Sequence, residues 1–147
     1  MLTFYAAEIA VGLEKNLSLR TLDLSNNQVK NSVRFLSEAL CHNSSLLSLT
    51  LSSNFLENSG AFLLVPMLKK NTTLRTLFLD RNGVTEVGYA ALAVAWISNR
   101  SLQSLGLSSN PISDRELACD QPKVLGENQQ LTRSNIAAFK KVAKWKR

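Results

Sequence analysis

The sequence predicts an α/β solenoid with a curved parallel sheet inside and helices outside. One eleven-residue pattern occurs four times, with leucine at its first, fourth and sixth places and asparagine at its ninth. The copies start at Leu19, Leu46, Leu74 and Leu102, so they follow one another at intervals of 27, 28 and 28 residues. Apolar residues recur at helical spacing between the copies. A fixed period of this length is typical of a repeat protein whose unit combines one strand and one helix.

The spacing within each copy predicts a short parallel strand whose alternate residues face the core. The leucines expected to point inward are Leu22, Leu24, Leu49, Leu51, Leu77, Leu79, Leu105 and Leu107. The first leucine of each copy is expected to turn inward from the loop before it. The asparagines that stand where the chain leaves each strand are Asn27, Asn54, Asn82 and Asn110. A buried asparagine there can bond backbone groups of its own and neighbouring turns, which predicts a structural asparagine ladder.

Three segments between the strands are expected to be helices that face the strands. They span 32–40, 59–68 and 87–96, and their apolar pairs four residues apart are Leu36 and Leu40, Leu64 and Leu68, and Leu92 and Trp96. Ser32 and Ser59 are expected to cap two of these helices. Pro66 is expected to kink the second helix or to confine it to its first turns.

Residues 1–16 are predicted to be the helical half of a truncated repeat. Tyr5, Ile9 and Leu13 are four residues apart and lead into the first copy, but no strand precedes them. A solenoid end without a polar cap exposes its core to water. We therefore expect the sequence to be a piece of a longer protein, and the alternative is that another chain covers this end.

The repeats are expected to occupy residues 17–116 and to give way, over 117–147, to a degenerate turn and a basic C-terminal capping helix. Pro122 interrupts any long helix inside that segment, and Ser134 can cap a final helix, NIAAFKKVAKWKR. Its basic residues are Lys140, Lys141, Lys144, Lys146 and Arg147, which leave the rest of the chain with a net charge of +1 out of a total of +6. This tail could be a solvated helix face, could contact an acidic partner or anionic lipid, or, last in order, could bind nucleic acid.

The repeats resemble the leucine-rich repeat of the ribonuclease-inhibitor type, whose unit of about 28 residues combines one strand and one helix. The resemblance covers residues 5 to about 116, through LRTLDLSNNQV, LLSLTLSSNFL, LRTLFLDRNGV and LQSLGLSSNPI. It implies a right-handed horseshoe fragment with four full strands. The same subtype occurs in ribonuclease inhibitor, in NOD-like receptor arrays, in the activating protein of the Ran GTPase and in axonemal and other intracellular scaffolds.

Composition and motifs argue against an enzyme, a secreted protein and a membrane protein. The 147 residues are 45% hydrophobic and 19% charged, and no apolar run approaches the roughly 18 residues of a membrane span. No basic segment of a secretory signal opens the chain, and Cys41 and Cys119 are expected to be reduced thiols. The chain has no Gly-rich phosphate loop, nucleophile motif or zinc-ligand spacing, so we propose no catalytic, cofactor-binding or metal residues.

Four asparagines, Asn16, Asn43, Asn71 and Asn99, begin glycosylation patterns. They recur at one phase of the repeat, just before each strand, where a polar turn must end the helix. The repeat itself explains them, so we interpret them as turn residues and not as glycosylation sites.

The concave surface of the predicted sheet carries the candidate partner-binding residues. The residues between the core leucines form rows that are mostly small and polar, and Phe78 is the one large apolar side chain among them. Aromatic residues dominate binding hot spots, and small neighbours let a partner approach closely. The expected binding surface consists of Phe78, Asp80, Arg81, Asp23 and Thr50.

The sequence therefore predicts a non-catalytic protein–protein interaction module in a longer intracellular protein. We expect that protein to be cytoplasmic, with cytoskeletal or ciliary association, and its protein partner to bind the concave strand face. Two alternatives stay open: a structural scaffold element of an axoneme or sensor oligomer, and a GTPase-activating protein of the Ran-regulator type. No catalytic residue of the latter can be matched here.

Overall fold

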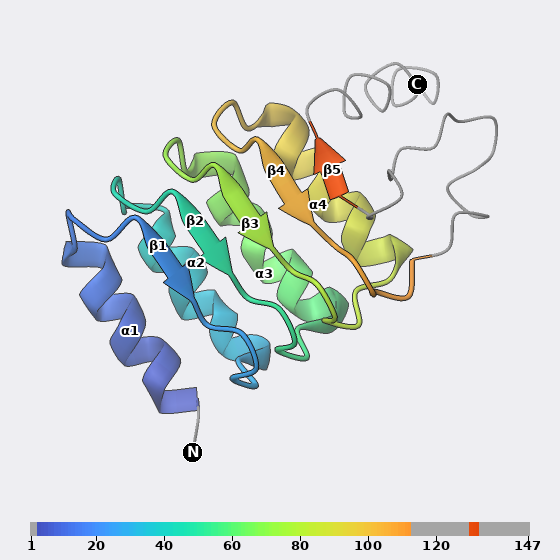
Figure 1. The fold of residues 1–147 in the computed structure, drawn as a ribbon, viewed down its shortest axis with the longest axis horizontal. Coiled ribbons are helices and arrows are strands. Elements are labelled where there is room, and N and C mark those ends of the chain that lie inside the picture. The colour runs from blue at the N-terminus through green and yellow to red at the C-terminus, as the bar shows by residue number, and fades with distance from the viewer. Residues whose placement is uncertain (1–2, 113–129, 133–147) are drawn as a thin grey trace.

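The computed structural model of the protein describes residues 3–112 and 130–132. Within these residues the chain alternates helices and short strands (Figure 1). The elements are α1 (Thr3–Lys15), β1 (Thr21–Asp23), the 3-10 helix η1 (Lys30–Ser32), α2 (Val33–Leu40), β2 (Ser48–Thr50), α3 (Glu57–Lys70), β3 (Thr76–Phe78), α4 (Glu86–Ser98), β4 (Ser104–Gly106) and β5 (Gln130–Thr132).

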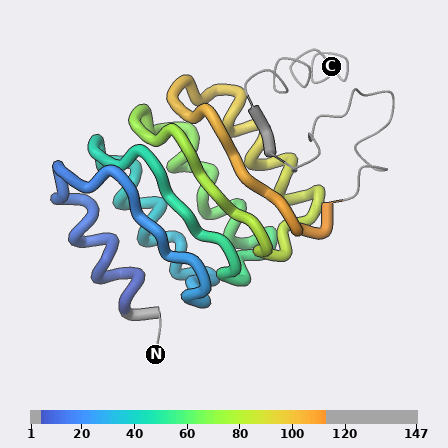
Figure 2. Tube along the Cα trace, viewed as in Figure 1, coloured from blue at the N-terminus to red at the C-terminus, as the bar shows by residue number. Residues whose placement is uncertain are grey.

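The first four strands form the predicted parallel sheet, in the order β1-β2-β3-β4. Each residue pairs with the same place in the next copy, so that Leu22 lies beside Leu49, Leu49 beside Leu77 and Leu77 beside Leu105. Figure 2 shows the resulting row of similar turns, in which each unit repeats the path of the one before. The α/β solenoid expected from the sequence is confirmed.

A fifth strand, not expected from the sequence, lies within the C-terminal segment. In residues 117–147, predicted to hold a degenerate turn and a capping helix, β5 pairs antiparallel with β4, with Leu131 beside Leu105. The outer edge of β4 would otherwise present unpaired backbone groups, and pairing with β5 satisfies them. The predicted capping helix and its five basic residues lie outside the described residues.

The helices match the predicted segments within about two residues at each end, but neither of the two expected serine caps makes a capping bond. Ser32 precedes α2 in helical conformation and its side chain makes no capping bond. Ser59 lies inside α3, where its hydroxyl donates to the carbonyl of Leu56. The N-terminus of α4 is instead capped by Asn58 of the preceding helix, whose Oδ1 accepts from the N–H groups of Thr85 (2.9 Å) and Gly88 (3.1 Å). The cap thus comes from the neighbouring repeat.

Pro66 does not confine α3 to its first turns, because the helix continues to Lys70. Proline removes one backbone N–H and leaves the carbonyl four residues earlier without its helical donor. That carbonyl belongs to Phe62, and both Phe62 and Pro66 are exposed, so water can satisfy it. The fully buried Leu64, Met67 and Leu68 hold the rest of the helix against the sheet.

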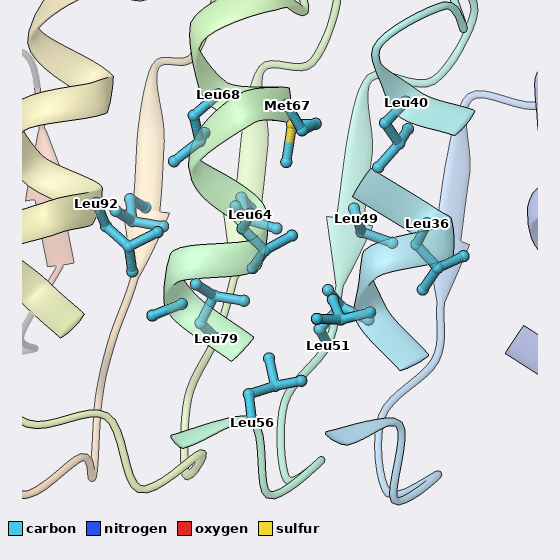
Figure 3. Packing of buried hydrophobic residues seen from close by; sticks show 14 of the residues in the cluster. Leu36, Leu40, Leu49, Leu51, Leu56, Leu64, Met67, Leu68, Leu79 and Leu92 are labelled. Atoms are coloured by element: carbon cyan, nitrogen blue, oxygen red, sulfur yellow. The ribbon is translucent and has the colours of Figure 1, made fainter. Parts of the chain in front are cut away.

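The core lies between the strands and the helices. The inward leucines of β2, β3 and β4 are fully buried, and so are the predicted helix residues from Leu36 to Trp96. Figure 3 shows Leu36 and Leu40 of α2 directed toward the strand leucines Leu49 and Leu51. Three expectations fail at the N-terminal end: Leu19 is 37% exposed, and Leu22 and Leu24 are only partly buried. Among the described strands, β1 has a neighbour on one side only, so its leucines are less covered than those of β2 to β4.

The asparagines that follow the strands bond from repeat to repeat. The Oδ1 of Asn82 accepts from the N–H groups of Asn54 (2.8 Å) and Leu56 (3.3 Å), and its Nδ2 donates to the carbonyl of Leu51 (2.9 Å). Asn54 and Asn110 bond the preceding repeat in the same way. Asn27 differs from the expectation of a buried ladder residue, because its side chain is exposed and, within the described residues, donates to the carbonyl of Ser25 of its own turn alone.

A second asparagine ladder runs along the opposite ends of the strands. The Nδ2 of Asn71 donates to the carbonyls of Leu40 (2.7 Å) and Asn43 (3.2 Å), and its Oδ1 accepts from the N–H groups of Thr73 and Leu74. Asn43 and Asn99 repeat this arrangement. Asn43 and Asn71 are 4% exposed. Their amides are therefore structural groups, buried and fully engaged, as the interpretation as turn residues requires.

Candidate protein-binding surface

One row of residues crosses the sheet on the face opposite the helices, which we call the strand face. Asp23, Thr50, Phe78 and Gly106 pair in register from β1 to β4. Because their strand neighbours point into the core, these side chains point away from it. The structure thus brings three of the five predicted site residues, Asp23, Thr50 and Phe78, into one line.

Phe78 is not the freely exposed side chain that the sequence suggested. It is partly buried, and its ring lies against Gly106 of the next strand. A Cβ added at Gly106 would lie 2.6 Å from Cδ1 of Phe78, closer than real contacts allow. Gly106 is buried under this ring. The missing side chain of Gly106 therefore leaves the space in which the ring of Phe78 packs, and Phe78 stays partly exposed.

Asp80 is fixed beside this contact. Its Oδ1 accepts from the N–H of Ser108 (2.6 Å) and its Oδ2 from the hydroxyl of Ser52 (3.3 Å). The carboxylate therefore links the segment that follows β2 to the segment that follows β4. A carboxylate held by two donors loses little conformational entropy when a partner binds it. Phe78 and Asp80 thus present an aromatic edge and an oriented negative charge side by side around Gly106.

Asp23 and Arg81 lie at the margins of this surface. Both the hydroxyl (2.6 Å) and the N–H (2.8 Å) of Ser25 donate to Oδ1 of Asp23. These hydrogen bonds, the hydroxyl's foremost, lower the pKa of Asp23 below its usual value. Arg81 is exposed in the turn after β3, where its backbone is left-handed with φ of 53° and its N–H donates to the carbonyl of Ser108 (2.9 Å).

The side chains next to these residues on the strand face are short and polar. Thr21, Ser48, Thr76 and Ser104 form the neighbouring row, in register across the sheet. The hydroxyl of Thr76 donates to that of Ser48 at 2.7 Å, so these short side chains satisfy one another. A partner could therefore reach Phe78 and Asp80 without displacing any large side chain of the sheet.

The structure exposes apolar groups that the sequence reading did not single out. Phe55 is 60% exposed in the turn after β2, with a left-handed φ of 54°, and Phe62 on α3 is 47% exposed. Aligning the repeats would have shown the first, because Phe55 occupies the place that Gly83 holds one unit later. The exposure of Phe62 follows from its position opposite the buried stripe of α3, and helical periodicity could have shown it.

On the helix side, a groove lies between α1 and α2. This groove of about 380 Å³ is lined by both helices and includes Phe35, Glu14, Glu38 and His42. Phe35 is covered by the guanidinium of Arg34, 4.5 Å from its ring centroid. The groove mixes acidic, basic and apolar groups and gathers no set of convergent donors.

Within residues 3–112 and 130–132, no group of three or more histidine, cysteine or acidic side chains could hold a metal ion. Cys41 is a partly buried free thiol, and its burial raises its pKa. None of the helices in the described part of the chain is long and apolar enough to cross a membrane. The geometry of the strand face suits recognition of another molecule's surface.

Comparison with known sequences places the chain in a family. The model of the leucine-rich repeat family matches residues 15–32, 42–65, 70–93 and 98–115. The chain belongs to the leucine-rich repeat family. Each matched segment contains one of the four parallel strands, and the second and third also include the first part of α3 and of α4. The period of 27 to 28 residues is compatible with the ribonuclease-inhibitor-like subtype.

Among curated proteins, the leucine-rich repeat chain is similar to capping protein, Arp2/3 and myosin-I linker protein 3 of Homo sapiens, Rattus norvegicus and Mus musculus. Identity is 35% over 101 residues, which cover 69% of the chain and 7% of each relative. The chain thus spans a small part of the length of these relatives.

Two solved structures share the fold. The tropomodulin C-terminal domain of Caenorhabditis elegans superposes with a TM-score of 0.63 at 19% identity, over 74% of the chain and 65% of that domain. Leiomodin-1 actin-binding site 2 gives a TM-score of 0.63 at 24% identity, over 72% and 61% of the two chains. At these identities the likeness is one of fold.

Proposed function

We propose that this leucine-rich repeat chain is a protein-interaction module that binds its partner on the strand face, around Phe78. One observation carries the proposal. The ring of Phe78 packs against Gly106, beside the carboxylate of Asp80, which hydrogen bonds hold in place. Asp23, Thr50 and Arg81 complete the surface. A half-buried aromatic ring in a preorganised polar setting matches the usual composition of a binding hot spot.

The comparisons support a partner from the actin cytoskeleton. The curated relatives are named for linking capping protein, Arp2/3 and myosin-I, and one structural neighbour is an actin-binding site of leiomodin-1. We therefore propose that the chain acts without catalysis or cofactor in a cytoplasmic, cytoskeleton-associated protein. The basic residues Lys140, Lys141, Lys144, Lys146 and Arg147 would add an electrostatic contact to an acidic partner surface.

A binding panel tests this proposal. Monomeric actin, capping protein, Arp2/3 and a myosin-I tail are each titrated with the chain by isothermal calorimetry. We expect one of them to bind, and Thr50→Arg, which puts a long charged side chain beside Phe78, to weaken that binding at least roughly tenfold.

The matched control is Val94→Arg, which places the same charge at an exposed position of α4 on the helix side. It should leave the affinity within roughly twofold. If none of the four proteins binds, the cytoskeletal assignment is wrong. If Thr50→Arg and Val94→Arg lower the affinity equally, or if only Val94→Arg lowers it, the contact lies away from the strand face. The scaffold alternative would then be favoured.

A further inference from the structure

Around β3 and β4, charged side chains are sorted between the two edges of the sheet. At the edge where the helices end and the strands begin (Figure 1), the exposed basic residues are Lys69, Lys70, Arg75 and Arg100, which we call the basic cluster. No aspartate or glutamate occurs in 58–79 or in 87–112. The acidic residues of these units lie at the opposite edge, where the strands end and the helices begin: Glu57, Asp80 and Glu86.

The second asparagine ladder holds the basic cluster together. Asn99 joins the turn after α4 to the end of α3, because its Nδ2 donates to the carbonyls of Leu68 (2.7 Å) and Asn71 (2.9 Å). Leu68 and Asn71 flank the two lysines of the cluster, and Arg100 directly follows Asn99. The lysines and Arg100 therefore come from neighbouring units and lie at one hydrogen-bonded junction.

Arg75 is oriented by the same junction. Its Nη1 donates to the carbonyl of Ser101 at 3.1 Å, and Arg20 makes the equivalent bond to the carbonyl of Ser45 at 2.9 Å two units earlier. A guanidinium has five N–H donors, so this bond fixes the direction of the group and leaves further donors for a carboxylate. The chain thus presents an exposed and preorganised guanidinium beside two lysines.

The stability of the helices explains only part of this cluster. Lys69 and Lys70 lie in the last turn of α3, where positive charge favours the helix dipole. Arg75 and Arg100 lie outside the helices, so the dipole does not account for them. Like charges held close together also repel one another in the folded chain. A negatively charged binding partner would relieve that repulsion.

We propose that the basic cluster binds an acidic segment of a partner protein. The side chains beside it are polar and mostly short: Thr72, Thr73 and Gln103. They leave room for an extended segment whose carboxylates pair with the cluster. Arg75 precedes Phe78 on the same strand by three residues, roughly 10 Å, so the cluster is also within reach of a protein that covers the strand face.

Other polyanions fit the cluster less well. Single-stranded nucleic acids stack their bases on exposed aromatic rings. Trp96, in the last turn but one of α4, is 1% exposed, and its Nε1 donates to the carbonyl of Leu102. Binding to an anionic bilayer combines basic groups with apolar side chains that enter it, whereas the side chains beside this cluster are polar.

A fluorescein-labelled polyglutamate peptide tests the proposal, with binding to the whole chain followed by fluorescence anisotropy. We expect saturable binding that weakens as salt rises, because salt screens exposed charges. Replacing both Lys70 and Arg75 with glutamine should weaken binding at least roughly tenfold. The matched control replaces Lys30 and Arg34, which lie at the start of η1 and of α2, and should stay within roughly twofold.

Two further variants keep the result interpretable. Arg75→Gln removes a hydrogen bond, so Lys69→Gln with Lys70→Gln repeats the test at the exposed end of α3, where we expect at least a roughly threefold loss in a chain that stays folded by circular dichroism. All comparisons are also made with the basic tail neutralised by glutamine at Lys140, Lys141, Lys144 and Lys146.

This site does not depend on the surface around Phe78, and the measurement keeps the two apart. Phe78→Ala should leave the affinity for polyglutamate within roughly twofold. The proposal is overturned if the chain with the neutralised tail does not bind the peptide, or if the cluster and control substitutions lower the affinity equally. It is also overturned if phosphatidylserine vesicles or a single-stranded oligonucleotide bind the cluster more tightly than the peptide does.

Discussion

At the scale of single residues, position within the array decides what identical side chains do. Asn71 and Asn16 occupy the same place in successive units, yet Asn71 is buried and bonds two repeats, whereas Asn16 is partly exposed and bonds only its own turn. A sequence pattern identifies the place and its residue type. It does not identify the neighbour, which comes from the next unit along the solenoid.

Asn71→Ala should therefore destabilise the chain by about 2–4 kcal/mol, because it leaves the buried carbonyls of Leu40 and Asn43 and two N–H groups without partners. Asn16→Ala should cost less than about 1 kcal/mol, since water can reach the groups that it releases. Urea unfolding followed by circular dichroism measures both. Equal losses would mean that the second ladder contributes nothing beyond its local turns.

The contact between Phe78 and Gly106 gives a second residue-scale prediction. Gly106→Ala should destabilise the chain by about 1–3 kcal/mol, because the new methyl group overlaps the ring of Phe78. In a Phe78→Ala background the same change should cost distinctly less, leaving the nearby carboxylate of Asp80 as the remaining obstacle. A double-mutant cycle on unfolding free energies measures this coupling. Additive losses would show that the ring does not rest on Gly106.

At the scale of elements, the sequence was sufficient to locate the parallel strands and the helices, but not to predict how their ends are capped or paired. The leucine spacing located β1 to β4, and the pairs from Leu36 to Trp96 located the buried helix faces. The cap of α4 was missed because Asn58 comes from α3 and not from the residue before the helix. β5 was missed because its three residues carry no strand signal of their own and depend on the open edge of β4.

The uninterrupted path of α3 through Pro66 leads to an element-scale prediction. Pro66→Ala restores an N–H that can donate to the carbonyl of Phe62, and removes the clash of the proline ring with that carbonyl. The gain is partly offset because alanine leaves the unfolded chain more conformational freedom. We expect a net stabilisation of about 1 kcal/mol or more, measured by thermal unfolding. A lower melting temperature would indicate that the ring of Pro66 packs in a way that alanine cannot replace.

At the scale of the whole molecule, the array has two different ends and one distinctive face. β5 closes the sheet at β4, whereas β1 presents unmatched ladders and exposed leucines. The period predicted the solenoid, because each unit packs against its neighbours. The candidate site was only half predictable: alternation placed Phe78 on the strand face, but its packing against Gly106 depends on a residue 28 positions away in the next strand.

The central claim is that a partner binds the strand face through Phe78. It is tested most directly by the affinity of Phe78→Ala for whichever protein the binding panel identifies, with Phe62→Ala as the control because it removes an exposed phenylalanine from the helix side. We predict that Phe78→Ala weakens binding by about 2 kcal/mol, roughly 30-fold, in a chain that remains folded by circular dichroism, and that Phe62→Ala changes the affinity less than about twofold. An unchanged affinity for Phe78→Ala, or a loss confined to Phe62→Ala, would contradict the claim and move the binding surface to the helices.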